Sequence, residues 1–234
     1  MIMKQISRVV FGAAAALTCA ATAAVSQSPG TSNADKVAQY ATDKLKSDLT
    51  LTADQVPKVQ KVNLAGANEL EALLNKYDAD TSIASDKALA RGLLAARRKQ
   101  QGELKKIFTP AQWTLHQQHK AEQLALSQTE TMAQDLRLSS NQILEVARIN
   151  QDGANKLVRA IEKPMSETKP VPGALLAAAK PVIDARDLQL EKVLTVDQFK
   201  KMQANRRALM ELFVSEASST PNPSAAAAAP KPKP

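Results

Sequence analysis

The stretch Leu51-Thr52-Ala53-Asp54-Gln55 decides how this chain folds, because its pattern returns three more times. In each copy an apolar residue and a hydroxyl residue are followed by two small or polar positions and then by glutamine. The later copies are Phe108-Thr109-Pro110-Ala111-Gln112, Leu138-Ser139-Ser140-Asn141-Gln142 and Leu194-Thr195-Val196-Asp197-Gln198. We refer to the four stretches as boxes 1 to 4.

Each box has the pattern of a helix start. A hydroxyl at the N-cap accepts a hydrogen bond from the amide three residues later, and a glutamine at that later position accepts one from the N-cap amide. Apolar residues before the cap and at the fourth helical position pack together as a hydrophobic staple. The staple pairs are Leu51 with Val56, Phe108 with Trp113, Leu138 with Ile143, and Leu194 with Phe199.

The spacing of the boxes indicates an internal duplication of a unit that holds two boxes. Boxes 1 and 2 begin 57 residues apart and boxes 3 and 4 begin 56 apart, while box 3 follows box 1 by 87 residues and box 4 follows box 2 by 86. At the offset of 87, ten of the 23 residues in the range 48–70 recur unchanged. This period is typical of a duplicated helical unit, because solenoid repeats are usually about 20–50 residues long.

Composition and pattern predict an all-α fold of long antiparallel helices in two tandem units. Aromatic residues make up 3% of the chain, and no stretch has the alternating pattern of a strand. The predicted divisions are a signal peptide (1–23), a linker (24–33), a first unit (34–134), a second unit (135–216) and an Ala/Pro/Lys tail (217–234). We expect Pro57 to kink the helix that follows box 1 and Pro164 to stop the helix that follows box 3.

The N-terminal residues read as an export signal. Two basic residues precede an apolar segment, 9–17, that is too short to span a bilayer, and Ala21-Thr22-Ala23 fits a cleavage site. We therefore expect secretion to a bacterial periplasm. The competing interpretation is a lipoprotein anchored through Cys19, but Ala16-Leu17-Thr18 makes a poor lipobox.

The charge of the chain indicates acidic partners. Removal of residues 1–23 takes two of the 31 basic residues and none of the 23 acidic ones, so the net charge of +8 becomes +6. An exported protein meets little nucleic acid, so we expect no nucleic-acid partner. The mature chain has no predicted transmembrane segment. Acidic envelope surfaces or unfolded envelope proteins are the expected partners.

The sequence predicts neither an enzyme nor a cofactor. After residue 23 it has no cysteine, two histidines and no glycine-rich phosphate loop. His116 and His119 share a helix face and could supply two metal ligands, or they are two solvated histidines on a polar helix. Gly66 and Gly153 lie in mid-helix, where a close helix crossing or a ligand contact would explain them.

Basic residues form a ridge on the helix that precedes box 2. Arg91, Arg98 and Lys105 recur every seven residues, and Arg97 adjoins them. The ridge is either a solvated face or a surface that attracts unfolded chains before apolar contacts hold them.

The boxes, the export signal and the basic helical chain together resemble the Spy/CpxP family of periplasmic stress proteins, whose signature is a pair of LTxxQ motifs. Boxes 1 and 4 match the motif fully, box 2 has Phe108 in place of leucine, and box 3 has Ser139 in place of threonine. The resemblance implies an ATP-independent, cradle-shaped helical chaperone that holds clients on a basic, partly apolar face. Other relatives bind or sense metals through histidines.

The resemblance leaves the function and the assembly open between alternatives. The leading hypothesis is a periplasmic holding chaperone for unfolded or misfolded envelope proteins. The alternatives are a metal-responsive protein that uses His116 and His119, and a structural envelope-associated helical protein. Family members usually carry one motif pair and form dimers, so two pairs in one chain predict either a pseudo-dimeric monomer or a homodimer.

Overall fold

The computed structural model describes residues 33–77, 83–166 and 173–214, and within these ranges it contains seven α-helices and no strand. The all-α prediction is therefore confirmed. The helices are α2 (Asn33–Leu49), α3 (Val56–Tyr77), α4 (Ile83–Ile107), α5 (Pro110–Leu136), α6 (Ser140–Ser166), α7 (Ala174–Leu190) and α8 (Val196–Val214). The predicted signal peptide with Cys19, nearly all of the predicted linker and the predicted tail lie outside the described residues.

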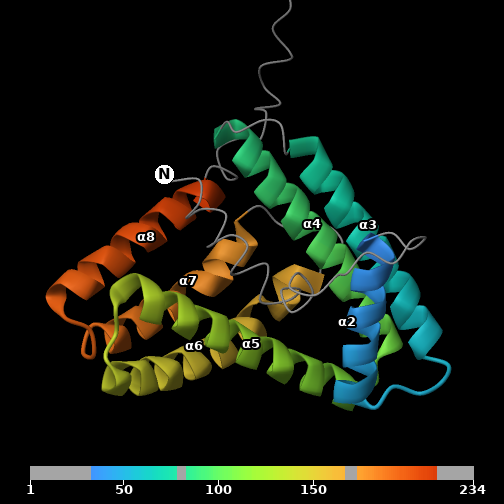
Figure 1. Ribbon diagram of the computed structural model, residues 1–234, viewed down its shortest axis with the longest axis horizontal. Helices are drawn as coiled ribbons and strands as arrows, with labels where there is room; N and C mark the ends of the chain where they lie inside the picture. The colour runs from blue at the N-terminus through green and yellow to red at the C-terminus, as the bar shows by residue number, and fades with distance from the viewer. Residues whose placement is uncertain (1–32, 78–82, 167–172, 215–234) are drawn as a thin grey trace, which may run out of the picture.

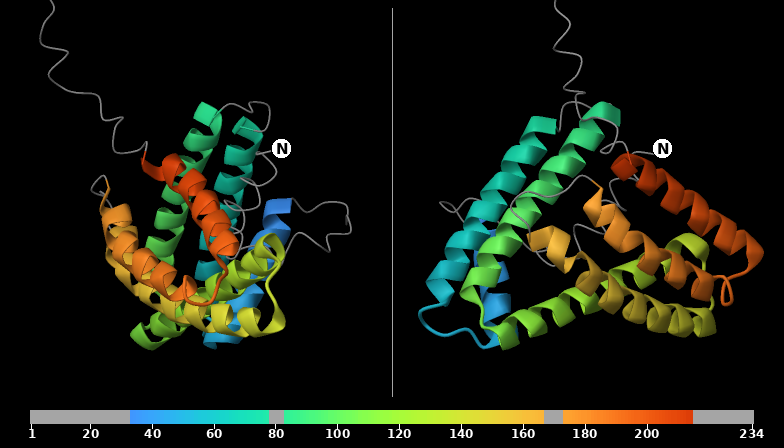
Figure 2. Two further views of the ribbon diagram at one scale, coloured as in Figure 1. Left: turned by 90° about the vertical axis from the view of Figure 1, so that its left-hand side faces the viewer. Right: turned by 180° about the vertical axis from the view of Figure 1, so that it is seen from behind.

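The helices form a three-sided frame (Figure 1). One side is the pair α3 and α4, with α2 packed on α3, and the base is the pair α5 and α6. On the third side α7 packs on α6, and α8 contacts both α4 and α5. The view from behind gives the same outline (Figure 2). Within the described helices, none is long and apolar enough to cross a membrane.

Boxes 2, 3 and 4 begin helices as predicted. In box 2 the Gln112 amide donates to the Thr109 hydroxyl at 3.2 Å, and the Thr109 amide donates to Gln112 Oε1 at 2.9 Å. Pro110 occupies the first turn, where its missing N–H leaves no helical bond unmade. The same pair of bonds joins Ser139 with Gln142 and Thr195 with Gln198.

Box 1 makes only half of this capping arrangement. Gln55 Oε1 accepts from the Thr52 amide at 3.0 Å, but helix α3 begins at Val56. Pro57 explains the late start, because it has no N–H to donate to the carbonyl of Ala53. The kink expected at Pro57 is therefore wrong, since this proline lies in the first turn of α3.

The expectation that Pro164 stops its helix is also wrong. Helix α6 continues to Ser166 with Pro164 inside its last turn. A proline removes one backbone bond, here the bond to the carbonyl of Ala160. Packing offsets this loss, because Val158 and Met165 on either side of the proline are both buried.

Two hydrophobic clusters surround the boxes, one for each box pair. The first consists of Leu49, Leu51, Val59, Leu104, Phe108 and Trp113. The second consists of Leu136, Val146, Ile149, Leu190, Leu194 and Met202. Helix α5 takes part in both, with Trp113 near its start and Leu136 at its end. The division at residues 134 and 135 stays a prediction, although it falls inside this shared helix.

Candidate functional site

The glutamines of boxes 1 and 2 bind each other. Gln55 Nε2 donates to Gln112 Oε1 at 2.8 Å and to the Ile107 carbonyl at 2.9 Å. Gln112 Nε2 donates to Gln55 Oε1 at 3.0 Å and to the Leu49 carbonyl at 3.2 Å. Each side-chain amide thus donates to a carbonyl at the end of the helix before the other box, and its oxygen accepts from the backbone amide three residues earlier in its own box. We call this pair clasp 1.

Boxes 3 and 4 make the same arrangement, which we call clasp 2. Gln142 Nε2 donates to Gln198 Oε1 at 2.8 Å and to the Val193 carbonyl at 3.1 Å. Gln198 Nε2 donates to the Leu136 carbonyl at 3.2 Å and to Gln142 Oε1 at 3.4 Å. Sequence reasoning identified these residues as caps and missed that they pair. The signal that pointed to the pairing was the nearly equal spacing of 57 and 56 residues.

A buried Thr–Asn hydrogen bond also recurs in both units. Asn63 Nδ2 donates to the Thr42 hydroxyl at 2.9 Å, and Asn150 Nδ2 donates to the Thr129 hydroxyl at 3.0 Å. Each hydroxyl in turn donates to the carbonyl four residues earlier. Both asparagines are buried, so these bonds satisfy amide N–H groups that water cannot reach, whereas Asn150 Oδ1 has no hydrogen-bond partner among the described residues.

The mid-helix glycines make room for long side chains from the next helix. A Cβ on Gly66 would lie 3.1 Å from Gln100 Nε2, and one on Gly153 would lie 2.9 Å from Arg186 Cδ. The close neighbour is thus a side chain and not the backbone of a crossing helix. Over Gly66, Gln100 Nε2 reaches Asn63 Oδ1 at 3.1 Å.

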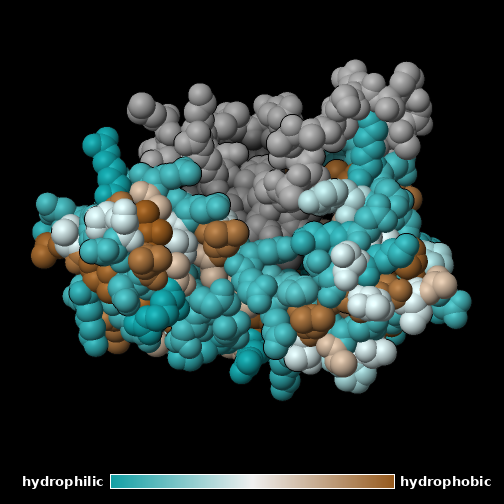
Figure 3. Space-filling model, turned by 60° about the horizontal axis from the view of Figure 1, so that its bottom comes forward, coloured by the Kyte–Doolittle hydropathy of each residue, from teal (hydrophilic) through white to brown (hydrophobic). Residues whose placement is uncertain are grey.

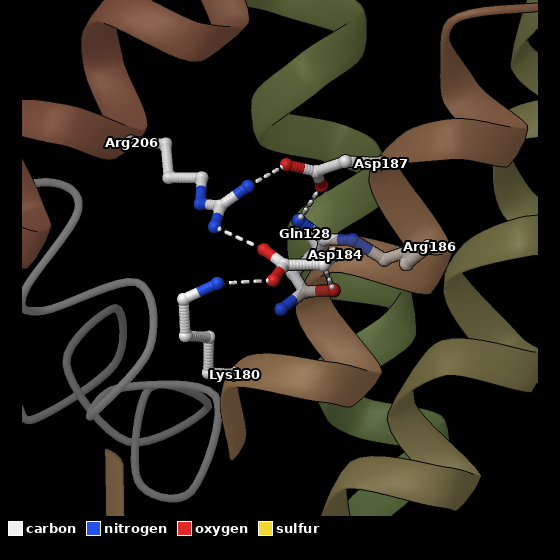
Figure 4. A network of polar contacts seen from close by, with 6 residues as sticks. All are labelled: Gln128, Lys180, Asp184, Arg186, Asp187 and Arg206. Carbon is white, nitrogen blue, oxygen red and sulfur yellow. Dashed lines mark hydrogen bonds and ion pairs between the residues drawn. The ribbon is translucent and has the colours of Figure 1, made fainter. Parts of the chain in front are cut away.

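A network of charged side chains surrounds Arg206 on α8 (Figure 4). Arg206 on α8 donates to Asp187 and, at 2.8 Å, to Asp184, both on α7. Asp187 is buried and also accepts from Arg186 at 3.3 Å, while Arg186 donates to Gln128 Oε1 at 2.9 Å. These contacts tie α8 and α5 to α7.

The predicted basic ridge on α4 is less exposed than its spacing implied. Arg91, Arg97 and Arg98 are all partly buried, and burial lowers the pKa of Arg97. Lys105 is 43% exposed and forms an ion pair with Glu162 on α6 at 2.9 Å. The binding of clients by these four residues stays a prediction.

Trp113 joins the first unit to α6. Its Nε1 donates to Glu162 Oε1 at 2.9 Å, and Lys105 Nζ lies 5.4 Å from the centre of its ring. The hydrogen bonds from Lys105 and then from Trp113 lower the pKa of Glu162. Tryptophan was expected only as a staple residue; here it also links α5 to α6, which packs on both α4 and α5.

The two histidines have different surroundings. His116 packs against the rings of Phe108 and Trp113, with centroids 5.5 and 5.6 Å away. Burial, and then the charges of neighbouring cations, lower its pKa to about 3. His119 Nδ1 lies 3.6 Å from Asp48 Oδ2 on α2. Within the described part of the chain, no three His, Cys, Asp or Glu side chains form a group that could hold a metal.

Several large aliphatic side chains face solvent on α5 and in the second unit. Exposed fractions reach 61% for Leu126, 71% for Leu144, 63% for Leu188 and 70% for Val196. Figure 3 shows hydrophobic side chains gathered toward both ends of the face that carries α5 and α6, with hydrophilic ones between them. Such groups can hold another apolar surface without covalent chemistry.

Comparisons of the chain with protein-family models, curated proteins and solved structures found no match.

Proposed function

We propose that the protein is an ATP-independent holding chaperone of the periplasm, which binds unfolded or misfolded envelope proteins. The resemblance of the boxes to the LTxxQ motif supports the compartment and the class. One structural observation carries the proposal further, namely the exposed aliphatic side chains of α5 and of the second unit, compared with the residues that stand one repeat earlier in the chain.

The duplication supplies an internal comparison for these side chains. Leu126 and Leu144 correspond to first-unit positions at an offset of 87, and Leu188 and Val196 at an offset of 86. The first-unit residues, in the same order, are Gln39, Pro57, Gly102 and Pro110. None of the four is a large aliphatic residue, yet the first unit forms the same clasp and the same kind of core.

The fold of a unit therefore does not need aliphatic residues at these positions. Exposed leucines bury little area in the folded chain, so they contribute little to its stability. Their presence where the fold does not need them favours a role in binding an apolar partner, as does the exposure of Tyr40 and Leu115 in the first copy. The positive charge of the chain would draw unfolded acidic chains to this surface before apolar contacts form.

An aggregation assay tests the proposal directly. The mature protein should slow the aggregation of a chemically denatured client at low salt without ATP. Protection should weaken as salt is raised, because salt screens attraction between exposed charges beyond about 10 Å at 0.1 M. Absence of protection at stoichiometric protein would reject the proposal.

The metal-responsive and structural alternatives stay predictions. The first gains no support from the geometry, because His116 is packed between two aromatic rings while His119 lies beside Asp48. A melting temperature that zinc or copper leaves unchanged would count against it.

A further inference from the structure

Corresponding cationic side chains in the two units have different partners. Lys120 on α5 and Arg206 on α8 are 86 residues apart, which is the offset between boxes 2 and 4. Arg206 is held by two carboxylates, those of Asp184 and Asp187. Lys120 instead donates to the neutral Oε1 of Gln101 at 3.0 Å.

The residues at the carboxylate positions explain this difference. Gln101 corresponds to Asp187, and Arg98 corresponds to Asp184. The first unit has therefore replaced one carboxylate by an amide and the other by a cation. Arg98 Nε is itself buried and has no hydrogen-bond partner among the described residues.

Two charged side chains of opposite sign act on Lys120. Burial and, after it, the charge of Arg97 on α4 lower the pKa of Lys120 to about 8. The charge of Glu162 on α6 acts in the opposite direction, but that carboxylate is hydrogen-bonded to Lys105 and Trp113. His116 lies one turn earlier on α5 and is held neutral by its surroundings.

A second observation at this place is independent of charge. Gln117 stands three residues before Lys120, so the two side chains share a face of α5. Both polar atoms of the Gln117 amide are buried, and neither has a hydrogen-bond partner among the described residues. A buried amide without partners is costly, so a group that supplies them is stabilised there.

We propose that Lys120, Gln117 and Gln101 form a binding site for a carboxylate group, which pairs with Lys120 as the carboxylates of Asp184 and Asp187 pair with Arg206 in the second unit. Lys120 Nζ supplies the charge, and Gln117 Nε2 supplies a second donor. The side chain of Lys120 is only partly buried. The ligand class is an acidic side chain of a polypeptide, and the site exists whether or not the protein is a chaperone.

The test follows the ionisation of Lys120 in the full mature chain by NMR of lysine labelled at Cε. The probe is N-acetylglutamate N-methylamide, and Lys120→Arg assigns the signal. The pKa of Lys120 should rise on saturation by about 1–3, the effect of an opposite charge at contact distance. Lys99, whose side chain is 69% exposed, is the reference lysine that reports any change of pKa caused by ionic strength alone.

The matched control variant restores the carboxylate of the second unit. Gln101→Glu should raise the pKa of Lys120 without any probe and should abolish the response to it. If the Gln101→Glu variant does not melt cooperatively, Gln101→Asp serves as the control variant in its place. An unresponsive Lys120 at tens of millimolar probe would overturn the proposal. A rise of the Lys120 pKa in the Gln101→Glu variant equal to that in the parent would also overturn it. So would a rise of equal size when methyl phosphate replaces the probe.

Discussion

Gln55 and Gln112 hydrogen-bond to each other through both side-chain amides, at 2.8 and 3.0 Å, although 57 residues separate them in the chain. Each also accepts from its own N-cap amide and donates to a carbonyl beside the other box. The acceptor and both donors of each amide are thereby used. The motif therefore does more than start helices, because it fixes which two helix starts lie together.

The pairing predicts that the two glutamines of a clasp contribute to stability as a unit. Gln112→Ala should lower the free energy of unfolding by about 1–3 kcal/mol, because it leaves partly buried groups on Gln55 and at Leu49 without partners. Gln55→Ala should cost a similar amount. Because the two variants remove the same bonds, the double variant should cost about 0.5–3 kcal/mol less than the sum. Urea unfolding of the four proteins measures this, and additive costs would contradict the clasp.

The hydroxyl residues of the boxes should differ in importance. The Thr195 hydroxyl accepts from the Gln198 amide at 3.3 Å, so Thr195→Ala should cost about 0.5–2 kcal/mol. The Thr52 hydroxyl makes no such bond among the described residues, because Pro57 delays the start of α3. Thr52→Ala should therefore change stability by less than Thr195→Ala. Equal losses in urea unfolding would show that box 1 caps its helix as the others do.

The buried histidine predicts loss of stability in acid. Folding lowers the pKa of His116 from 6.5 to about 3, so the unfolded chain binds more protons between these values. The contribution of neutral His116 to the free energy of unfolding is complete above pH 6.5. It is lost as the pH is lowered through this window, by about 3 kcal/mol at pH 4. His116→Phe should remove that part of the decrease, and His119→Gln should keep it. Urea midpoints from pH 7 to 4 give the comparison, and identical profiles for His116→Phe and the parent would refute it.

The closure of both clasps within one chain predicts a monomer in solution. Each box finds its partner box in the same polypeptide, so no second copy is needed to complete a pair. Light scattering of residues 24–234 at micromolar concentration should give the mass of one copy. A dimer that persists on dilution would favour the homodimer that the family resemblance also allowed.

The helix starts could be predicted because their cause is local. A cap hydroxyl, a glutamine three residues later and a staple residue lie within one turn, so box 4 behaves as its sequence indicates. The effect of Pro164 is not local in this sense. Burial of Val158 and Met165 decides whether α6 continues past the proline, and that depends on which helices pack there.

The candidate binding groups were harder to predict for the same reason. Arg97 and Arg98 have the spacing of a solvated ridge, and only the frame of α4, α5 and α6 shows that they are partly buried. Asp48 is far from His119 in sequence and reaches it because α2 packs beside α5. Lys120 carries no motif at all. Its position becomes informative only through comparison with Arg206 in the other unit.

The central claim is that exposed aliphatic side chains of the second unit and α5 hold unfolded clients. The most direct measurement compares the mature chain with a Leu126→Gln, Leu144→Gln, Leu188→Gln variant in the aggregation of a denatured client. The claim predicts that this variant melts at nearly the parent temperature and loses most of its protection. A Glu122→Gln, Glu130→Gln variant, changed at exposed polar positions, should protect as the parent does. Full protection by the folded leucine variant would contradict the claim.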